Sequence, residues 1–103
     1  MDKPFSLEIK HDNDKQEVVL SGELIINHAE IIKEELMHTI DFSKHLNVKV
    51  DNPTGIDITF IQFILSIKLA YKNKGLPFNL EGTFSDDMSA LVVNAGFKDL
   101  FKL

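Results

Sequence analysis

Hydrophobic and polar side chains alternate in two short segments near the N-terminus. The segment Phe5–Ile9 alternates strictly, and Glu17–Ser21 has a similar strand character. A period of two is typical of a strand with one buried face. The polar stretch 11–15 between them predicts a turn, so we expect an antiparallel hairpin.

Helical periodicity follows the hairpin. Apolar residues recur along one face of the segment 29–40, and Asn27 with Glu30 three residues later has the spacing of a capping box. We therefore expect a first helix that Asn27 caps. Alternation returns in Leu46–Val50, which predicts a third strand, and Asp51–Gly55 is rich in turn-forming residues.

The most apolar part of the chain, Ile61–Tyr71, predicts a second helix. Thr59 and Gln62 repeat the capping-box spacing, so we expect Thr59 to be its N-cap and Gly75 its left-handed C-terminal residue. Apolar residues cover more of this helix than one core-facing stripe requires. We expect a neighbouring helix or the C-terminal tail to cover the excess, and contact with a partner is the alternative.

A short strand at Pro77–Leu80 and a third helix capped by Ser85 complete the pattern, and Phe97–Phe101 is an apolar tail that we expect to dock on the core. Helices that separate the later strands favour parallel pairing with right-handed crossovers. We therefore expect one α/β domain over residues 1–103, in which helices flank a small mixed sheet of about four strands.

Composition narrows the functional classes. A chain of 103 residues, 44% of them hydrophobic, is long enough for one core. Without cysteine it has no disulfide and no thiolate metal site, which fits a cytoplasmic location. The formal charge of −5, without a clustered basic face, argues against a nucleic-acid partner. The longest apolar run is shorter than the ~20 residues of a membrane span, so we expect no direct membrane insertion.

Support for catalysis is weak. The chain has no cysteine nucleophile, no serine in a glycine-flanked elbow and no glycine-rich phosphate loop after a strand. The histidines, at positions 11, 28, 38 and 45, include no pair at metal-ligand spacing. We therefore expect a non-enzymatic protein with no catalytic residue, no cofactor and no metal site.

The order and spacing of several short motifs resemble those of STAS domains, the fold of bacterial anti-sigma-factor antagonists and of the cytoplasmic tails of sulfate transporters. Leu20–Leu24 is similar to the family's early strand motif, Val48–Asp51 to its central strand and Ile56–Thr59 to its Asp-Ser-Ser/Thr-Gly signature. Asn94–Phe101 is similar to its closing Gly-aliphatic-x-x-Leu-Phe pattern. The resemblance covers almost the whole chain and implies a single STAS-like domain with a small mixed sheet.

The resemblance also implies a regulatory protein–protein interaction module in bacterial signal transduction and transcription regulation. The protein partner would be a kinase-like anti-sigma factor or a related signalling protein, and the kinase activity would belong to that partner. Thr59 matches the family's phosphoacceptor position, so its phosphorylation would release the partner. The chain departs from the family pattern at Ile58 and Phe60, where the family often has a serine and a glycine.

The expected partner surface is the loop around Asp57 together with the following helix. Its predicted residues are Asp57, Ile58, Thr59, Phe60 and Phe63. A phosphate on Thr59 would add about 1.5–2 negative charges close to Asp57. Two alternatives stay open, an accessory STAS-type subunit of a membrane transport assembly and a nucleotide-binding STAS domain. A homodimer through the apolar second helix is also left open.

Overall fold

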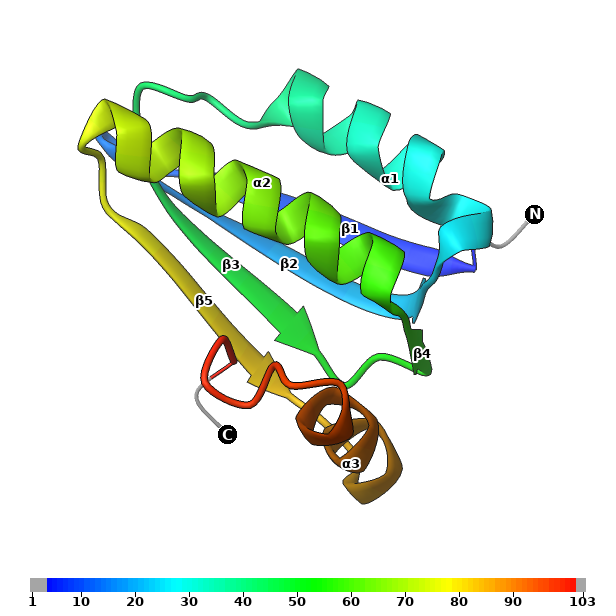
Figure 1. Cartoon of the computed structure of the whole chain (residues 1–103). Coiled ribbons are helices and arrows are strands. Elements are labelled where there is room, and N and C mark those ends of the chain that lie inside the picture. Colours follow the sequence, from blue (N-terminus) through cyan, green and yellow to red (C-terminus); the bar gives the residue numbers. More distant parts are fainter. Residues whose placement is uncertain (1–3, 102–103) are drawn as a thin grey trace.

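The computed structural model describes residues 4–101 as a mixed sheet and three helices (Figure 1). The elements, in chain order, are β1 (Phe5–His11), β2 (Lys15–Leu24), α1 (Ile26–Thr39), β3 (His45–Asp51), β4 (Gly55–Ile56), α2 (Ile58–Lys74), β5 (Phe78–Thr83) and α3 (Asp86–Asn94). This α/β architecture confirms the predicted fold class. The sheet has five strands, one more than predicted, because the two-residue β4 is too short to show a pattern in the sequence.

The sheet contains one antiparallel pair. β1 and β2 form the predicted hairpin, whereas β2 pairs in parallel with β3 and β4, and β3 pairs in parallel with β5. The main strand order is β1-β2-β3-β5, with β4 beside the end of β2. The parallel pairing predicted from the alternation of helices and strands is therefore confirmed.

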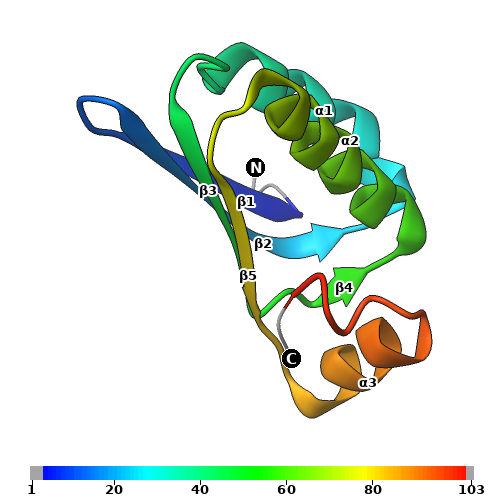
Figure 2. The ribbon, with the colours of Figure 1, turned by 60° about the vertical axis from the view of Figure 1, so that its left-hand side comes forward.

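Helices α1 and α2 lie side by side, run in the same direction and cover one face of the sheet (Figures 1 and 2). α1 connects β2 to its parallel neighbour β3, and α2, after the short β4, lies on the path from β3 to its parallel neighbour β5. Crossovers of one hand that progress in the same direction across the sheet place their helices on the same face. The opposite face carries a row of polar side chains. Asn79 donates to Asn47 Oδ1 at 3.0 Å, and Asn47 donates to Glu17 Oε2 at 3.3 Å.

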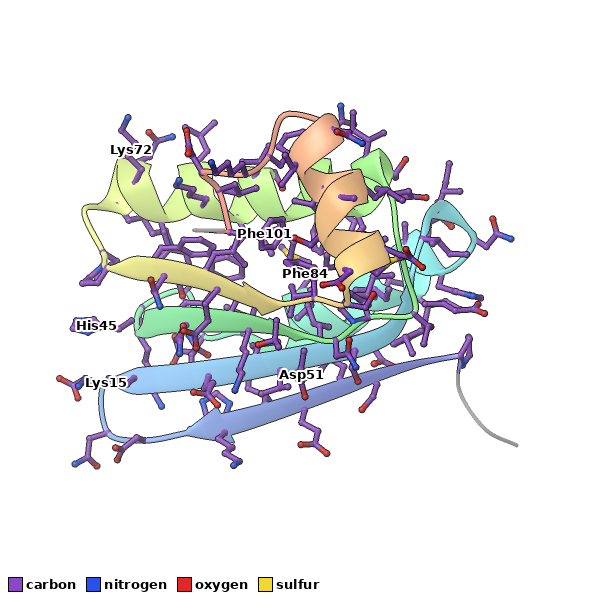
Figure 3. The ribbon with its side chains drawn as sticks, turned by 90° about the horizontal axis from the view of Figure 1, so that it is seen from below. Lys15, His45, Asp51, Lys72, Phe84 and Phe101 are labelled. Carbon is purple, nitrogen blue, oxygen red and sulfur yellow. The ribbon has the colours of Figure 1, made fainter. Side chains whose placement is uncertain are left out.

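The core lies between the sheet and these two helices. Its largest fully buried side chains are Tyr71, Phe60, Phe101, Leu20, Leu24 and Ile32. The burial of Phe101 confirms that the C-terminal tail docks on the core, where its ring packs edge-on against Phe84 at a centroid distance of 5.1 Å (Figure 3).

The excess of apolar residues on α2 is covered only in part. Phe63 and Leu65 are half-buried and pack against the core, whereas Ile58 and Leu69 stay 54% and 57% exposed. The expectation that α1 and the tail cover the excess is therefore wrong for these two side chains.

The ends of the helices show which capping residues the sequence predicted correctly. Gly75 ends α2 with a φ of 70°, as predicted, because glycine adopts this left-handed conformation without a steric penalty. Ser85 caps α3 and accepts a hydrogen bond from the Met88 backbone N–H at 3.3 Å. Both capping-box predictions are wrong, since the N-caps of α1 and α2 are Ile25 and Asp57.

Candidate functional site

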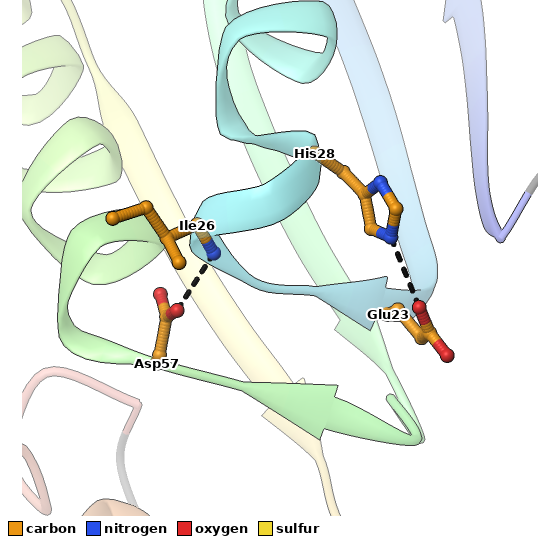
Figure 4. Close-up of polar contacts among 4 residues, drawn as sticks. All are labelled: Glu23, Ile26, His28 and Asp57. Carbon is orange, nitrogen blue, oxygen red and sulfur yellow. Dashed lines mark hydrogen bonds and ion pairs between the residues drawn. The ribbon is translucent and has the colours of Figure 1, made fainter.

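Asp57 joins the N-terminal ends of the two neighbouring helices. Its Oδ1 accepts a hydrogen bond from the Phe60 N–H at 3.1 Å, which makes it the N-cap of α2. Its Oδ2 accepts from the N–H of Ile26, the first residue of α1, at 2.7 Å (Figure 4). The first turn of a helix carries unpaired N–H groups and a partial positive charge. One carboxylate therefore stabilises the starts of two helices.

This double role explains why the capping predictions failed. Ile25, the N-cap of α1, offers no side-chain oxygen, and the missing acceptor comes from Asp57, 31 positions after Ile26. Asn27 and Thr59 are each the second residue inside a helix. A capping box detects partners within one turn, so it cannot detect a cap supplied by a distant segment.

Thr59 is half-buried, and the structure gives its hydroxyl no hydrogen-bond partner among residues 4–101. It lines a groove of about 360 Å³ between α1 and α2. The other lining residues are Ala29, Glu30, Lys33, Gln62, Phe63 and Ser66. A negative charge on Thr59 would thus lie at a helix N-terminus, where the helix dipole stabilises it, and in a groove that Glu30 and Lys33 share.

The predicted partner residues divide into exposed and buried ones. Ile58 is 54% exposed at the start of α2, and Phe63 is half-buried in the groove. Phe60 is only 1% exposed, so its ring belongs to the core and is not available to a partner in this conformation. The Phe60 ring therefore fills the core and leaves the groove beside Thr59 open.

Ile26 belongs to the same surface, although it is not among the partner residues predicted from the sequence. It is 61% exposed and starts α1, next to the Asp57 carboxylate. The signal was present in the chain, because Leu24, Ile25 and Ile26 form an unbroken apolar run where a strand changes into a helix. Side chains of successive residues point in different directions, so the three cannot all face one core.

A second polar contact holds the start of α1. The Nε2 atom of His28, in the first turn of α1, lies 2.9 Å from Glu23 Oε2 near the end of β2 (Figure 4). The His28 ring also packs against Phe5, at a centroid distance of 6.1 Å. The first turn of α1 is therefore fixed by contacts with Glu23, Phe5 and Asp57.

The C-terminal end of the helix layer, the layer formed by α1 and α2, contains a buried hydrogen-bond network. Gln16, in β2, is 3% exposed, and its side-chain amide pairs with both backbone groups of Asp41, donating to the carbonyl at 2.6 Å and accepting from the N–H at 2.9 Å. The amide also donates to the Tyr71 hydroxyl at 3.2 Å, and that hydroxyl donates to the Lys44 carbonyl at 2.9 Å. Burial raises the pKa of Tyr71. This network anchors the loop after α1 to the end of α2.

A comparison with models of known protein families found no match, and a search of curated proteins found no significant match. Within residues 4–101, no helix combines the length and hydrophobicity needed to cross a membrane. The same residues contain no group of three His, Asp or Glu side chains placed to hold a metal ion. The geometry around Asp57 and Thr59 is therefore the basis for a functional proposal.

Proposed function

We propose that this protein is a non-enzymatic STAS-type interaction module of a bacterial signalling pathway. It acts in the cytoplasm and binds a kinase-like anti-sigma factor or a related signalling protein. The observation that carries the proposal is that Asp57, and not Thr59, caps α2. The Thr59 hydroxyl, which lines an open groove, has no capping role in the fold and is available for modification.

The partner binds at the N-terminal end of α1 and α2. Ile58 and Ile26 supply exposed apolar surface there, and Phe63 supplies the wall of the groove. Asp57 contributes indirectly, because its two hydrogen bonds fix the relative position of the helix starts. Phe60 supports the surface from the core.

Phosphorylation of Thr59 acts on the partner rather than on the fold. The added charge of about −1.5 to −2 lies at a helix N-terminus, which favours an anion. Lys33 lines the same groove and adds to this local stabilisation. An acidic partner surface against Ile58 and Phe63 is repelled by the new charge, and an apolar one would have to bury the phosphate at a high cost in desolvation, so phosphorylation releases the partner.

The test begins with affinity purification of the tagged protein from its native cell, followed by phosphopeptide analysis. We expect a kinase-like protein to be recovered and a phosphate on Thr59. With the purified partner, Thr59→Glu lowers the affinity at least tenfold, about 1.4 kcal/mol, and Thr59→Ala changes it less than about twofold. Thr54→Glu, which adds the same charge at an exposed loop position, is the matched control and leaves binding unchanged.

Two results would contradict the proposal. The first is that Thr59→Glu and Thr59→Ala bind the partner equally well, while Phe63→Ala does not bind it. The partner surface would then stand, but phosphorylation of Thr59 would not control binding. Recovery of a transport ATPase or permease, with Thr59 unmodified, would instead favour an accessory subunit of a transport assembly.

Thr59→Ala also tests the capping assignment, since its free energy of unfolding stays within about 0.5 kcal/mol of wild type if Thr59 is not a cap.

A further inference from the structure

The first strand of the sheet has one edge with which no strand of residues 4–101 pairs. β1 pairs with β2 on its other side and stands at the end of the strand order β1-β2-β3-β5. Figure 3 shows β1 at the lower border of the sheet. Its register with β2 runs from Phe5 to His11 without a bulge, and the strand contains no proline. Bulges and prolines commonly block sheet edges in monomeric proteins, so this edge is open to pairing.

The hydrogen bonds of the hairpin fix which backbone groups point outward. The Asp12 N–H donates to the Lys15 carbonyl at 2.8 Å, and the Glu23 N–H donates to the Pro4 carbonyl at 2.9 Å. Hydrogen-bonded and non-hydrogen-bonded residues alternate along an antiparallel pair, so the even-numbered residues of β1 bond to β2. The odd-numbered residues direct their N–H and C=O groups to the outer edge. Among them are Leu7, Ile9 and His11.

Two charged side chains stand on this edge strand, Glu8 and Lys10, both exposed. Within the chain, Glu8 lies opposite Val19 and Lys10 opposite Glu17, and neither Glu8 nor Lys10 forms an ion pair within residues 4–101. Charges of one sign would protect an edge by repulsion. These two have opposite signs and lie two positions apart, so the edge is complementary to a copy of itself that runs in the opposite direction.

We propose that β1 pairs with β1 of a second copy of this chain, antiparallel and with Ile9 of each copy at the two-fold axis. Glu8 then lies opposite Lys10 of the second copy, and Lys10 opposite its Glu8. These are non-hydrogen-bonded positions, at which facing side chains lie closest. Ile9 exchanges backbone hydrogen bonds with Ile9 of the second copy, and Leu7 with its His11. Both copies use the same edge, so assembly stops at a dimer.

The charges select this register over its neighbours. A pairing centred on Glu8 places two glutamates opposite each other, and one centred on Lys10 does the same with two lysines. Like charges directly opposite each other destabilise a sheet. A pairing centred on Leu7 gives neither charge an opposite charge, and one centred on His11 pairs only the end of the strand. The register centred on Ile9 is therefore the favoured one.

The helix above this edge presents an apolar side chain to the same junction. α1 contacts β1 and β2, so a two-fold axis perpendicular to the sheet at this edge brings α1 of the two copies side by side. The His28 ring packs against Phe5, which places this side of α1 above β1. Ile31, three positions further on, lies on the same side and is 52% exposed. The dimer covers part of this side chain.

The contact is small, because it consists mainly of one pair of short strands. It buries less than the ~1,200 Å² at which standard interfaces begin, so we expect a dissociation constant on the order of 100 μM. The groove beside Thr59 lies between α1 and α2 and not at the β1 edge. The dimer therefore leaves the proposed partner surface open, and this inference does not rest on the proposed function.

Sedimentation equilibrium of the full chain, from about 10 μM to about 1 mM, tests the association. We expect the apparent mass to rise from 11.7 kDa towards twice that value. Hydrogen exchange over the same range tests the register. The amides of Leu7, Ile9 and His11 exchange more slowly at the highest concentration, whereas those of Glu8 and Lys10 already bond to β2 and do not change.

Charge reversal tests the contact between the two edges. Glu8→Lys and Lys10→Glu each place like charges opposite each other at both positions, so each weakens the dimer at least about tenfold. The double variant Glu8→Lys/Lys10→Glu restores opposite charges and associates within about threefold of wild type. An equimolar mixture of the two single variants associates in the same way. Lys10→Glu also faces Glu17 in its own chain, and recovery in the double variant separates that effect from the loss of the dimer.

The matched control is Glu81→Lys, which makes the same charge change at an exposed position of β5, the strand at the opposite end of the order. It leaves association unchanged. Wild-type protein that stays at 11.7 kDa up to about 1 mM overturns the proposal. A dimer that Glu8→Lys weakens no more than Glu81→Lys does, or a double variant that does not recover, overturns it too. None of these measurements involves a signalling partner, so the proposed function is tested separately.

Discussion

The two ends of the helix layer are held by hydrogen bonds of the same kind in different surroundings. At the N-terminal end, Asp57 accepts hydrogen bonds from backbone N–H groups of both helices, and its neighbours Ile26 and Ile58 are exposed. At the C-terminal end, the side chains of Gln16 and Tyr71 are almost completely buried. The buried end therefore fixes the fold, whereas the accessible end is the surface that we propose for a partner.

The reason for this division is the availability of water. A buried polar group that loses its partner costs about 1–3 kcal/mol, because no water replaces the lost hydrogen bond. At the surface, water satisfies the same group at a smaller cost. Substitutions at the C-terminal end should therefore lower stability more than substitutions at the N-terminal end.

The largest expected effect is that of Gln16→Leu. Leucine has a similar size but cannot pair with the Asp41 backbone or the Tyr71 hydroxyl, so we expect the free energy of unfolding to fall by about 3 kcal/mol. Urea unfolding followed by circular dichroism measures this change. Gln62→Leu, the same substitution at an exposed position of α2, is the control and changes stability by less than about 0.5 kcal/mol. A loss below about 1 kcal/mol for Gln16→Leu would show that the buried network is not the stronger of the two ends.

The second expected effect is that of Tyr71→Phe, which removes the hydrogen bond to the Lys44 carbonyl and should cost about 1.5 kcal/mol. This substitution also changes the response to alkaline pH. Burial raises the pKa of Tyr71 above the usual 10.0, so the folded state keeps its proton where the unfolded state loses it. The contribution of Tyr71 to stability is therefore complete below pH 10.0 and is lost as pH rises through the folded pKa.

The alkaline response is measurable at one residue, because Tyr71 is the single tyrosine and the chain has no tryptophan. The ultraviolet absorbance of the phenolate should show a midpoint above pH 10.0 in the folded protein. Urea unfolding at increasing alkaline pH should show a fall in stability that is smaller in Tyr71→Phe. A phenolate midpoint at or below 10.0 would contradict the burial of this hydroxyl.

Local signals in the sequence predicted the parts of the fold that local interactions determine. Gly75 and Ser85 mark helix ends through contacts within one turn, and the alternation of strands and helices predicted the parallel pairing. The candidate site was predicted only in part. Thr59 was placed correctly near the start of α2, but its surroundings depend on α1, which is distant in the sequence.

The features that escaped prediction depend on contacts between distant segments. Asp57 accepts a hydrogen bond from the first N–H of α1 across 31 positions, and Gln16 donates one to Tyr71 across 55. On α2, apolar residues surround most of the helix, so the pattern could not decide that Phe60 is buried and Ile58 exposed. Only the packing of α2 against the sheet and α1 determines which side of so apolar a helix faces water.

The smallest expected effect, Asp57→Asn, tests the double cap at the accessible end. Asparagine and aspartate are nearly equivalent at an ordinary N-cap, so a lone cap would lose almost nothing. Asp57, however, uses both carboxylate oxygens, one for the Phe60 N–H and one for the Ile26 N–H. Asparagine has a single acceptor oxygen and can serve only one of them. We therefore expect a loss of about 1 kcal/mol in urea unfolding, and faster hydrogen exchange at one of the two amides.

Asp99→Asn, which removes the same charge from an exposed position, separates the cap from a general charge effect and should be nearly neutral. If Asp57→Asn is also neutral and both amides keep their protection, the link between α1 and α2 through Asp57 does not contribute to stability. A loss of about 3 kcal/mol would instead place this end on a par with the buried network. The expected intermediate loss of stability follows from the position of the Asp57 carboxylate. It accepts hydrogen bonds from two helices at the surface, where water can partly replace a lost hydrogen bond.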